Sequence, residues 1–221
     1  MRSKEARSTT YPYRLLDDTT ALASFKGWSR EVYEDFFKLR AGDISERVFR
    51  DEYCRERKIL DIDMTGFTLS AFEVGEIKSL ARIFDAQRVL LPVLQDHGAE
   101  LIRCFADDVV ALFEDPGTAV DAALEIHERV RRFNASPLAS AHPTICCAGI
   151  GFGSVFAIGP NLAQGDEMNR AAKLGEDIAR GNETLVTERA YEAIKSRDDL
   201  AFERQDQDDL LFPFYRITGI E

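Results

Sequence analysis

The segment from residue 100 to residue 113 constrains the fold most, because two strands this close in sequence pair with each other. It holds two apolar runs on either side of a short turn formed by Ala106, Asp107 and Asp108. Two such runs joined by a short turn predict a β-hairpin. The chain must therefore contain antiparallel strands.

The elements around this hairpin predict an α+β fold. Strands are expected from alternating apolar residues and helices from apolar residues at helical spacing. In chain order, these elements are strand 58–64, helix 74–97, the hairpin, helix 116–133, a strand and the start of a tight glycine-rich turn over 144–156, helix 165–179, strand 183–186, helix 188–196 and two C-terminal strands. This order favours a ferredoxin-like antiparallel sheet with helices on one side.

The length of 221 residues suits one domain with an extension. We expect the domain over residues 58–221. An N-terminal arm and helical extension is expected over residues 1–57, with helices near 28–39 and 43–57.

Composition excludes several classes of protein. The net charge of −11 argues against binding to nucleic acid, which requires a cationic face. Four cysteines without CxxC spacing indicate free thiols in a reducing compartment. The N-terminus lacks the apolar core of a signal peptide, and no run approaches 18 apolar residues. We therefore expect a cytoplasmic protein with no membrane partner.

Two aspartates stand at the ends of predicted neighbouring strands. Asp63 lies next to a glycine turn, and Asp107 lies at the tip of the hairpin. In a ferredoxin-like sheet these strands are neighbours, so the two carboxylates can converge. Hard divalent cations such as Mg²⁺ and Mn²⁺ prefer oxygen ligands of this kind together with substrate phosphates. From these residues alone, an ordinary solvated acidic surface is the alternative.

The turn that follows Asp63 is a candidate for binding phosphate. Its backbone N–H groups can donate to phosphate oxygens, and its members are Thr65, Gly66, Phe67 and Thr68. Metal ions beside it would neutralise a triphosphate and lower the pKa of a ribose hydroxyl.

Four segments carry a family resemblance. They are Asp63-Met-Thr-Gly-Phe-Thr68, Arg103-Cys-Phe-Ala-Asp107, Gly149-Ile-Gly-Phe-Gly153 and the segment 165–174, GDEMNRAAKL. In this order they resemble the D-I-x-G-F-T, K-T-I-G-D, I-G-x-x-x-G and G-D-x-V-N-x-A-x-R-L motifs of class III adenylate and guanylate cyclases. Together they cover about residues 58–195.

The resemblance implies an enzyme that converts a nucleoside triphosphate to a 3′,5′-cyclic nucleotide and pyrophosphate. In that family the site is shared across a homodimer. Asp63 and Asp107 match the residues that bind two Mg²⁺ or Mn²⁺ ions, and Asn169 matches the asparagine that orients the ribose. Lys173 stands where the family has an arginine that stabilises charge on the α-phosphate. Lysine lacks the planar fork of arginine, which implies a slower or differently poised enzyme.

The two residues that match base-contact positions depart from the family pattern. Arg103 and Leu162 stand where adenylate cyclases carry lysine and aspartate or threonine, and guanylate cyclases carry glutamate and cysteine. Arg103 offers only donors, which suit the carbonyl groups of a one-ring base and oppose guanine. The chain in this respect resembles the pyrimidine cyclases of bacterial antiphage defence, which implies UTP, then CTP, as substrate. Adenine N1 can also accept from Arg103, so ATP stays open.

Two further aspartates border the metal pair. Strand alternation predicts Asp61 on the same face as Asp63, where it adds negative potential or, as we favour, pairs with a cation at the subunit interface. Alternation predicts Asp108 on the face opposite Asp107, and therefore not as a ligand. Lys173 and Leu162 leave open a non-catalytic cyclase homology domain that binds nucleotide or only dimerises.

Overall fold

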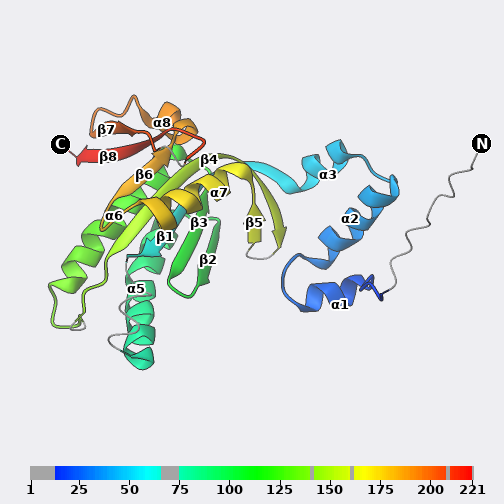
Figure 1. Ribbon diagram of the computed structural model, residues 1–221, viewed down its shortest axis with the longest axis horizontal. Helices are drawn as coiled ribbons and strands as arrows, with labels where there is room; N and C mark the ends of the chain where they lie inside the picture. Colours follow the sequence, from blue (N-terminus) through cyan, green and yellow to red (C-terminus); the bar gives the residue numbers. More distant parts are fainter. Residues whose placement is uncertain (1–12, 66–74, 140–141, 160–161, 208–209, 221) are drawn as a thin grey trace, which may run out of the picture.

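An eight-stranded sheet forms the centre of the computed structural model, which describes residues 13–65, 75–139, 142–159, 162–207 and 210–220. The strand order is β2-β3-β1-β4-β6-β8-β7, and β5 pairs with β4 (Figure 1). Only the pairing of β4 with β6 is parallel among these described strands. The strands are β1 (Cys54–Met64), β2 (Leu101–Phe105), β3 (Asp108–Phe113), β4 (Cys146–Gly159), β5 (Leu162–Gln164), β6 (Thr184–Thr187), β7 (Leu200–Gln205) and β8 (Phe214–Ile220).

Helices cover both faces of the sheet. They are α1 (Thr19–Ser24), α2 (Arg30–Ala41), α3 (Glu46–Tyr53), α5 (Glu76–Asp96), α6 (Pro116–Asn134), α7 (Asp166–Ala172), the π-helix η1 (Lys173–Ile178) and α8 (Glu188–Ile194). None of the helices in the described ranges is long and apolar enough to cross a membrane.

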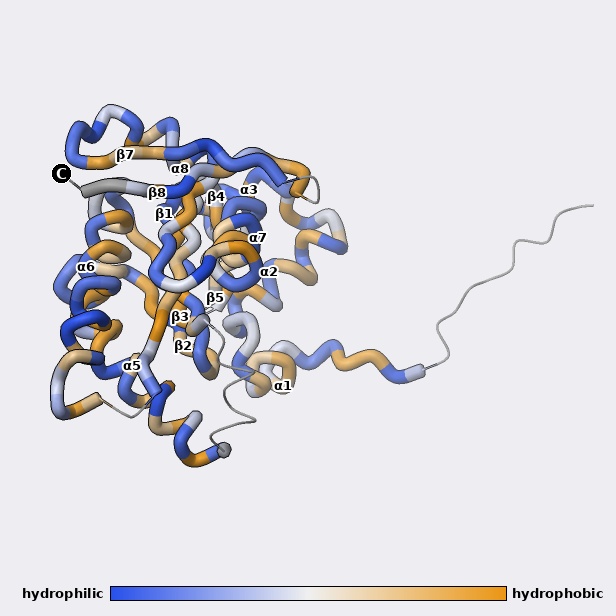
Figure 2. Tube along the Cα trace, turned by 60° about the vertical axis from the view of Figure 1, so that its left-hand side comes forward, coloured by the Kyte–Doolittle hydropathy of each residue, from blue (hydrophilic) through white to orange (hydrophobic). Residues whose placement is uncertain are grey.

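The central strand β1 is buried from both sides. Leu60 and Ile62 join the core beneath α5, α6 and α8, while Ile59 packs with Met168 and Ala171 of α7. Figure 2 shows the hydrophobic stretches concentrated along the inner strands. The predicted α+β fold is confirmed, but α7 and η1 cover a face that was expected to carry no helix.

Glycines on β4 allow α7 and η1 to lie close to the sheet. A Cβ on Gly149 would sit 2.0 Å from the carbonyl oxygen of Ala171, and one on Gly151 would sit 2.6 Å from that of Glu167. Both distances are far below van der Waals contact, so only glycine fits. These residues lie inside a strand that runs to Gly159, whereas the sequence predicted that they lead into a turn.

The N-terminal helices pack on the hairpin formed by β4 and β5, beside which Figure 1 shows them. Val32, Phe49 and Ile158 are buried together, with Trp28 and Phe36 packed against them. The N–H of Ser29 donates to the carbonyl of Ile158 at 3.0 Å. Helix α1 was not predicted. Strand β1 begins directly after α3, at Cys54, four residues earlier than expected.

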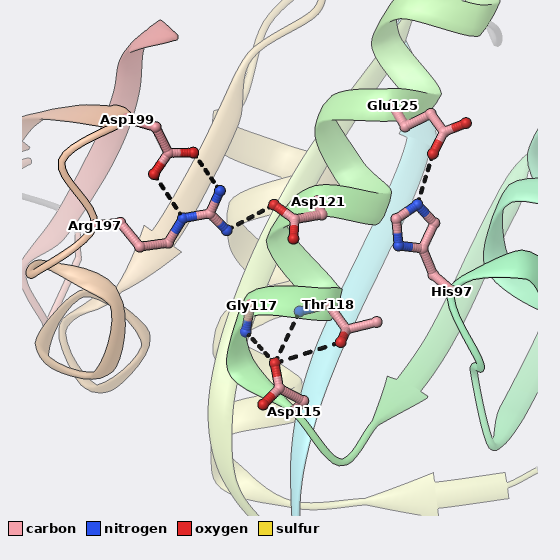
Figure 3. A network of polar contacts seen from close by, with 8 residues as sticks. All are labelled: His97, Asp115, Gly117, Thr118, Asp121, Glu125, Arg197 and Asp199. Atoms are coloured by element: carbon pink, nitrogen blue, oxygen red, sulfur yellow. Dashed lines mark hydrogen bonds and ion pairs between the residues drawn. The ribbon is translucent and has the colours of Figure 1, made fainter. Parts of the chain in front are cut away.

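A polar network fixes α6 to its neighbours (Figure 3). Asp115 caps the helix by accepting from the N–H groups of Gly117 and Thr118. Arg197, between α8 and β7, donates to Asp121 on α6 at 2.6 Å and also pairs with Asp199. These contacts hold the C-terminal strands against the helical layer.

The close approach at Gly149 leads to a stability prediction. Gly149→Ala should lower the free energy of unfolding by at least about 2 kcal/mol, because its Cβ would overlap the backbone of α7. Urea denaturation followed by circular dichroism measures the change.

Gly27→Ala is the matched control, since its Cβ would meet only the Tyr33 hydroxyl, at an ordinary 3.5 Å. Equal effects of the two substitutions would show that the contact between β4 and α7 is not tight in solution.

Candidate active site

Asp63 and Asp107 lie at the same end of the sheet. Asp63 is the penultimate residue of β1, and Asp107 lies in the turn between β2 and β3. Ala106 adopts the left-handed conformation with φ 53°, which a non-glycine residue rarely does. In the family motif that Arg103-Cys-Phe-Ala-Asp107 resembles, this position is glycine.

The two carboxylates interact electrostatically. Burial and, to a lesser extent, the nearby Asp107 carboxylate raise the pKa of Asp63 to about 6. Both side chains are only partly exposed. The structure thus brings together the two residues that the sequence predicted to converge.

Asp108 does not lie where the sequence predicted. Strand β3 begins at Asp108, so Asp107 belongs to the turn, and alternation does not relate the two residues. Because Ile62 pairs with Val109, the register continued by one residue sets Asp63 level with Asp108. Residues level with each other on paired strands point to the same face. Asp108 therefore shares a face with Asp63 and Asp61.

Three carboxylates gather on this face. Oxygen atoms of Asp61, Asp108 and Glu176 lie within 4.8 Å of one another, an arrangement that can hold a metal ion. Burial raises the pKa of Asp61 well above its usual range, and the carboxylates of Asp108 and Glu176 add to the shift. Burial also raises the pKa values of Asp108 and Glu176.

Arg103 borders this group. Its Nη2 donates to Oδ2 of Asp108 at 3.2 Å, and its charge opposes the rise in the pKa of Asp108. The Oδ1 atom of Asp61 is buried without a hydrogen-bond partner, and pairing of Asp61 with a cation at a subunit interface stays a prediction. Arg103 also lines a cavity of about 860 Å³ together with residues that precede and begin α2, including Trp28 and Ser29.

Thr65 is already engaged within the chain. Its N–H donates to the carbonyl of Ile145 at 2.9 Å, and its hydroxyl contacts the Cys147 sulfur at 2.7 Å. This N–H is therefore not free for a phosphate. The other predicted phosphate-binding residues, Gly66, Phe67 and Thr68, lie outside the described residues.

Asn169 lies on the exposed side of α7. Lys173 is the first residue of η1 and is also exposed. Lys173 donates to Asp177 at 2.7 Å, and both side chains are about half exposed. Single turns of π-helix often occur at functional sites. Leu162 begins β5, and nothing is described of its side chain.

Glu176 is the member of this site that sequence reasoning missed. It follows Lys173 by three residues in a segment with many charged side chains, so no local pattern distinguished it. Only the position of η1 over β1 and β3 brings it to Asp61. A charged residue inside the apolar run of β1 was the available signal that Asp61 has polar neighbours.

Comparison with known proteins identifies the fold. By sequence, no protein-family model and no curated protein matches the chain. Solved structures do match. The guanylyl cyclase domain of the RhoGC fusion protein from the aquatic fungus Blastocladiella emersonii superimposes with a TM-score of 0.64 and 15% identity, over 76% of this chain and 99% of that one. The chain therefore has the fold of a nucleotide cyclase domain.

Bacterial structures agree with this result. The adenylyl cyclase CyaB from P. aeruginosa matches with a TM-score of 0.62 and 17% identity, over 76% of this chain and 96% of that one. The adenylate/guanylate cyclase/hydrolase from Silicibacter pomeroyi matches with a TM-score of 0.60 and 21% identity, over 76% and 98%. At identities this low, the structural similarity establishes a shared fold and nothing further.

Proposed function

We propose that this chain is a metal-dependent nucleotide cyclase that converts a nucleoside triphosphate to a 3′,5′-cyclic nucleotide and pyrophosphate. The observation that carries the proposal is the convergence of Asp63 and Asp107 at one end of a sheet with the cyclase fold. The structural neighbours include guanylyl cyclase domains solved in complex with GTP and, after conversion of specificity, with ATPαS.

The two aspartates suit Mg²⁺ or Mn²⁺. Both offer carboxylate oxygens, which hard divalent cations prefer. Burial first, and then the Asp107 carboxylate, raise the pKa of Asp63, and a bound cation would favour its ionised form. Two ions bound by Asp63 and Asp107 would supply charge neutralisation for the triphosphate and would acidify the 3′-hydroxyl.

The chemistry is an internal displacement at phosphorus. The ribose 3′ oxygen forms a bond to the α-phosphorus, the bond to the bridging oxygen breaks, pyrophosphate leaves, and the 3′ proton passes to solvent. Asn169 would orient the ribose, and Lys173 would stabilise negative charge on the α-phosphate. Both roles rest on the motif resemblance.

The proposed enzyme is a homodimer whose sites are shared between subunits. Asn169 and Lys173 are exposed and therefore accessible to a second chain. Helix α5 also exposes apolar side chains at helical spacing, as an interface would: Ile77, Leu80 and Phe84.

We further propose a pyrimidine nucleotide as substrate, UTP before CTP. Arg103 supplies donors that suit the carbonyl groups of a pyrimidine base. A second-messenger role in antiphage defence extends this proposal, on the resemblance at Arg103 and Leu162 alone.

ATP is the alternative substrate. A non-catalytic nucleotide-binding domain is the alternative function, which the pairing of Lys173 with Asp177 favours.

Turnover is the first test. The full chain, incubated with Mn²⁺ and each of the four nucleoside triphosphates in turn, should form a cyclic nucleotide that chromatography resolves. Asp63→Asn and Asp107→Asn should each lower the rate at least about 100-fold, because each removes a ligand charge from the metal site.

Asp96→Asn is the matched control, since Asp96 is an exposed carboxylate on α5 with a side chain 66% exposed. The absence of cyclic product from all four substrates, or full activity in Asp63→Asn, would contradict a catalytic function.

Mixing of variants tests the shared site. Asp63→Asn and Asn169→Ala should each be inactive alone, because each damages both sites of its own homodimer. After the subunits exchange, half of the dimers are mixed and hold one intact site, which should restore roughly one quarter of wild-type activity. No recovery, despite exchange shown by differently tagged chains, would argue that one chain holds the whole site.

Base selection depends on Arg103. Arg103→Ala should lower kcat/KM for the preferred nucleotide at least about tenfold, because a charged hydrogen bond to the base is lost. The affinity for Mn²⁺ at Asp63 and Asp107, measured without nucleotide, should change much less. A wild-type preference for GTP would overturn the role assigned to Arg103.

A further inference from the structure

The group of Asp61, Asp108 and Glu176 lies beside the proposed catalytic pair but is made of other residues. Asp61 comes from β1, Asp108 from β3 and Glu176 from η1, so three elements distant in sequence meet there. Their carboxylate oxygens lie within 4.8 Å of one another. Asp61 and Asp63 are successive residues on one face of β1, and such residues are about 7 Å apart along a strand.

Two atoms of the group are buried and unsatisfied. Oδ1 of Asp61 and Oδ1 of Asp108 have no hydrogen-bond partner, and Asp61 as a whole is only 1% exposed. A buried carboxylate oxygen without a partner is costly, so native proteins pair such atoms or coordinate them to a cation. Arg103 engages the other oxygen of Asp108, which leaves the Oδ1 atom available.

Charge identifies the missing partner. The three carboxylates carry three negative charges when ionised, and Arg103 offsets one of them. A divalent cation would bring the four side chains to neutrality, whereas a neutral donor such as the amino group of a base would not. The ligands are all oxygens, which selects Mg²⁺, Mn²⁺ or Ca²⁺ over softer metals.

We propose that Asp61, Asp108 and Glu176 form a second, separate binding site for a divalent cation. The site does not depend on cyclase activity and is distinct from the Asp63 and Asp107 pair. A cation there joins η1 to β1 and β3. Lys173 is the first residue of η1. A cation bound by Glu176 would therefore also restrain the helix that carries Lys173.

The Asp61 side chain has room at this position because residue 175 of η1 is glycine. A Cβ on Gly175 would lie 2.8 Å from Oδ1 of Asp61. Residue 175 is therefore restricted to glycine next to the unsatisfied oxygen, and the backbone of η1 passes directly beside the site.

The test measures Mn²⁺ binding to the full chain without nucleotide. Asp107→Asn serves as the starting protein, because it disables the proposed catalytic pair through a residue in a surface turn. Electron paramagnetic resonance of free Mn²⁺ gives the amount bound. We expect one ion per chain in this protein, and adding Asp61→Asn should weaken its binding at least about tenfold.

Two further variants keep the test decisive if Asp61→Asn does not fold. Glu176→Gln, at an exposed position, should also weaken binding by about tenfold. Asp177→Asn, the adjacent carboxylate outside the group, should leave binding unchanged. Mn²⁺ should raise the melting temperature of the Asp107→Asn protein but not that of the Asp107→Asn, Glu176→Gln protein.

Three results would overturn the proposal. The first is loss of all binding in Asp107→Asn, which would assign the ion to the catalytic pair. The second is unchanged affinity after both Asp61→Asn and Glu176→Gln. The third is no binding up to about 1 mM Mn²⁺, which would mean that the carboxylates are satisfied by shared protons instead. Loss of cyclase activity with intact Mn²⁺ binding would contradict only the proposed function.

Discussion

The close contact of α7 and η1 with strand β4 determines the rest of this face of the molecule. Gly149 and Gly151 allow the helix backbone to lie against the strand, where any side chain would overlap a carbonyl oxygen. That contact sets the height of η1 above β1, and so brings Glu176 to Asp61. It also determines which side of α7 faces outward, with Asn169 and Lys173 on it. The geometry of the candidate site therefore depends on backbone packing as well as on its charged residues.

Much of this architecture was predictable from local patterns. The hairpin, the strand before it and the long helix between them follow from residue spacing, and the fold class follows from their order. The convergence of Asp63 with Asp107 was also predictable, because both lie at strand ends that the hairpin brings together. Helix boundaries agreed to within a few residues, as the position of Pro116 at the start of α6 illustrates.

The rest depended on information that no local pattern contains. Asp108 was assigned to the wrong face because alternation was applied across a turn, where the left-handed Ala106 interrupts it. Glu176 reaches the site through the docking of η1, which is a long-range contact. The glycines of β4 were expected to lead into a turn, since glycine serves both turns and close backbone approach, and the sequence does not distinguish the two uses. The roles of Asn169, Lys173 and Arg103 rest on family resemblance, and they stay predictions.

The direct join between α3 and β1 has a mechanical consequence. Tyr53 ends the helix and Cys54 begins the strand, so no loop separates the N-terminal helices from the strand that carries Asp61 and Asp63. The same helices grip the far end of β4 through Ser29 and Ile158. The N-terminal helices are therefore attached to the sheet at two adjacent points, the start of β1 and the end of β4, because Cys54 pairs with Phe156. A displacement of these helices would act on both strands at once, at the end of β1 opposite to Asp63.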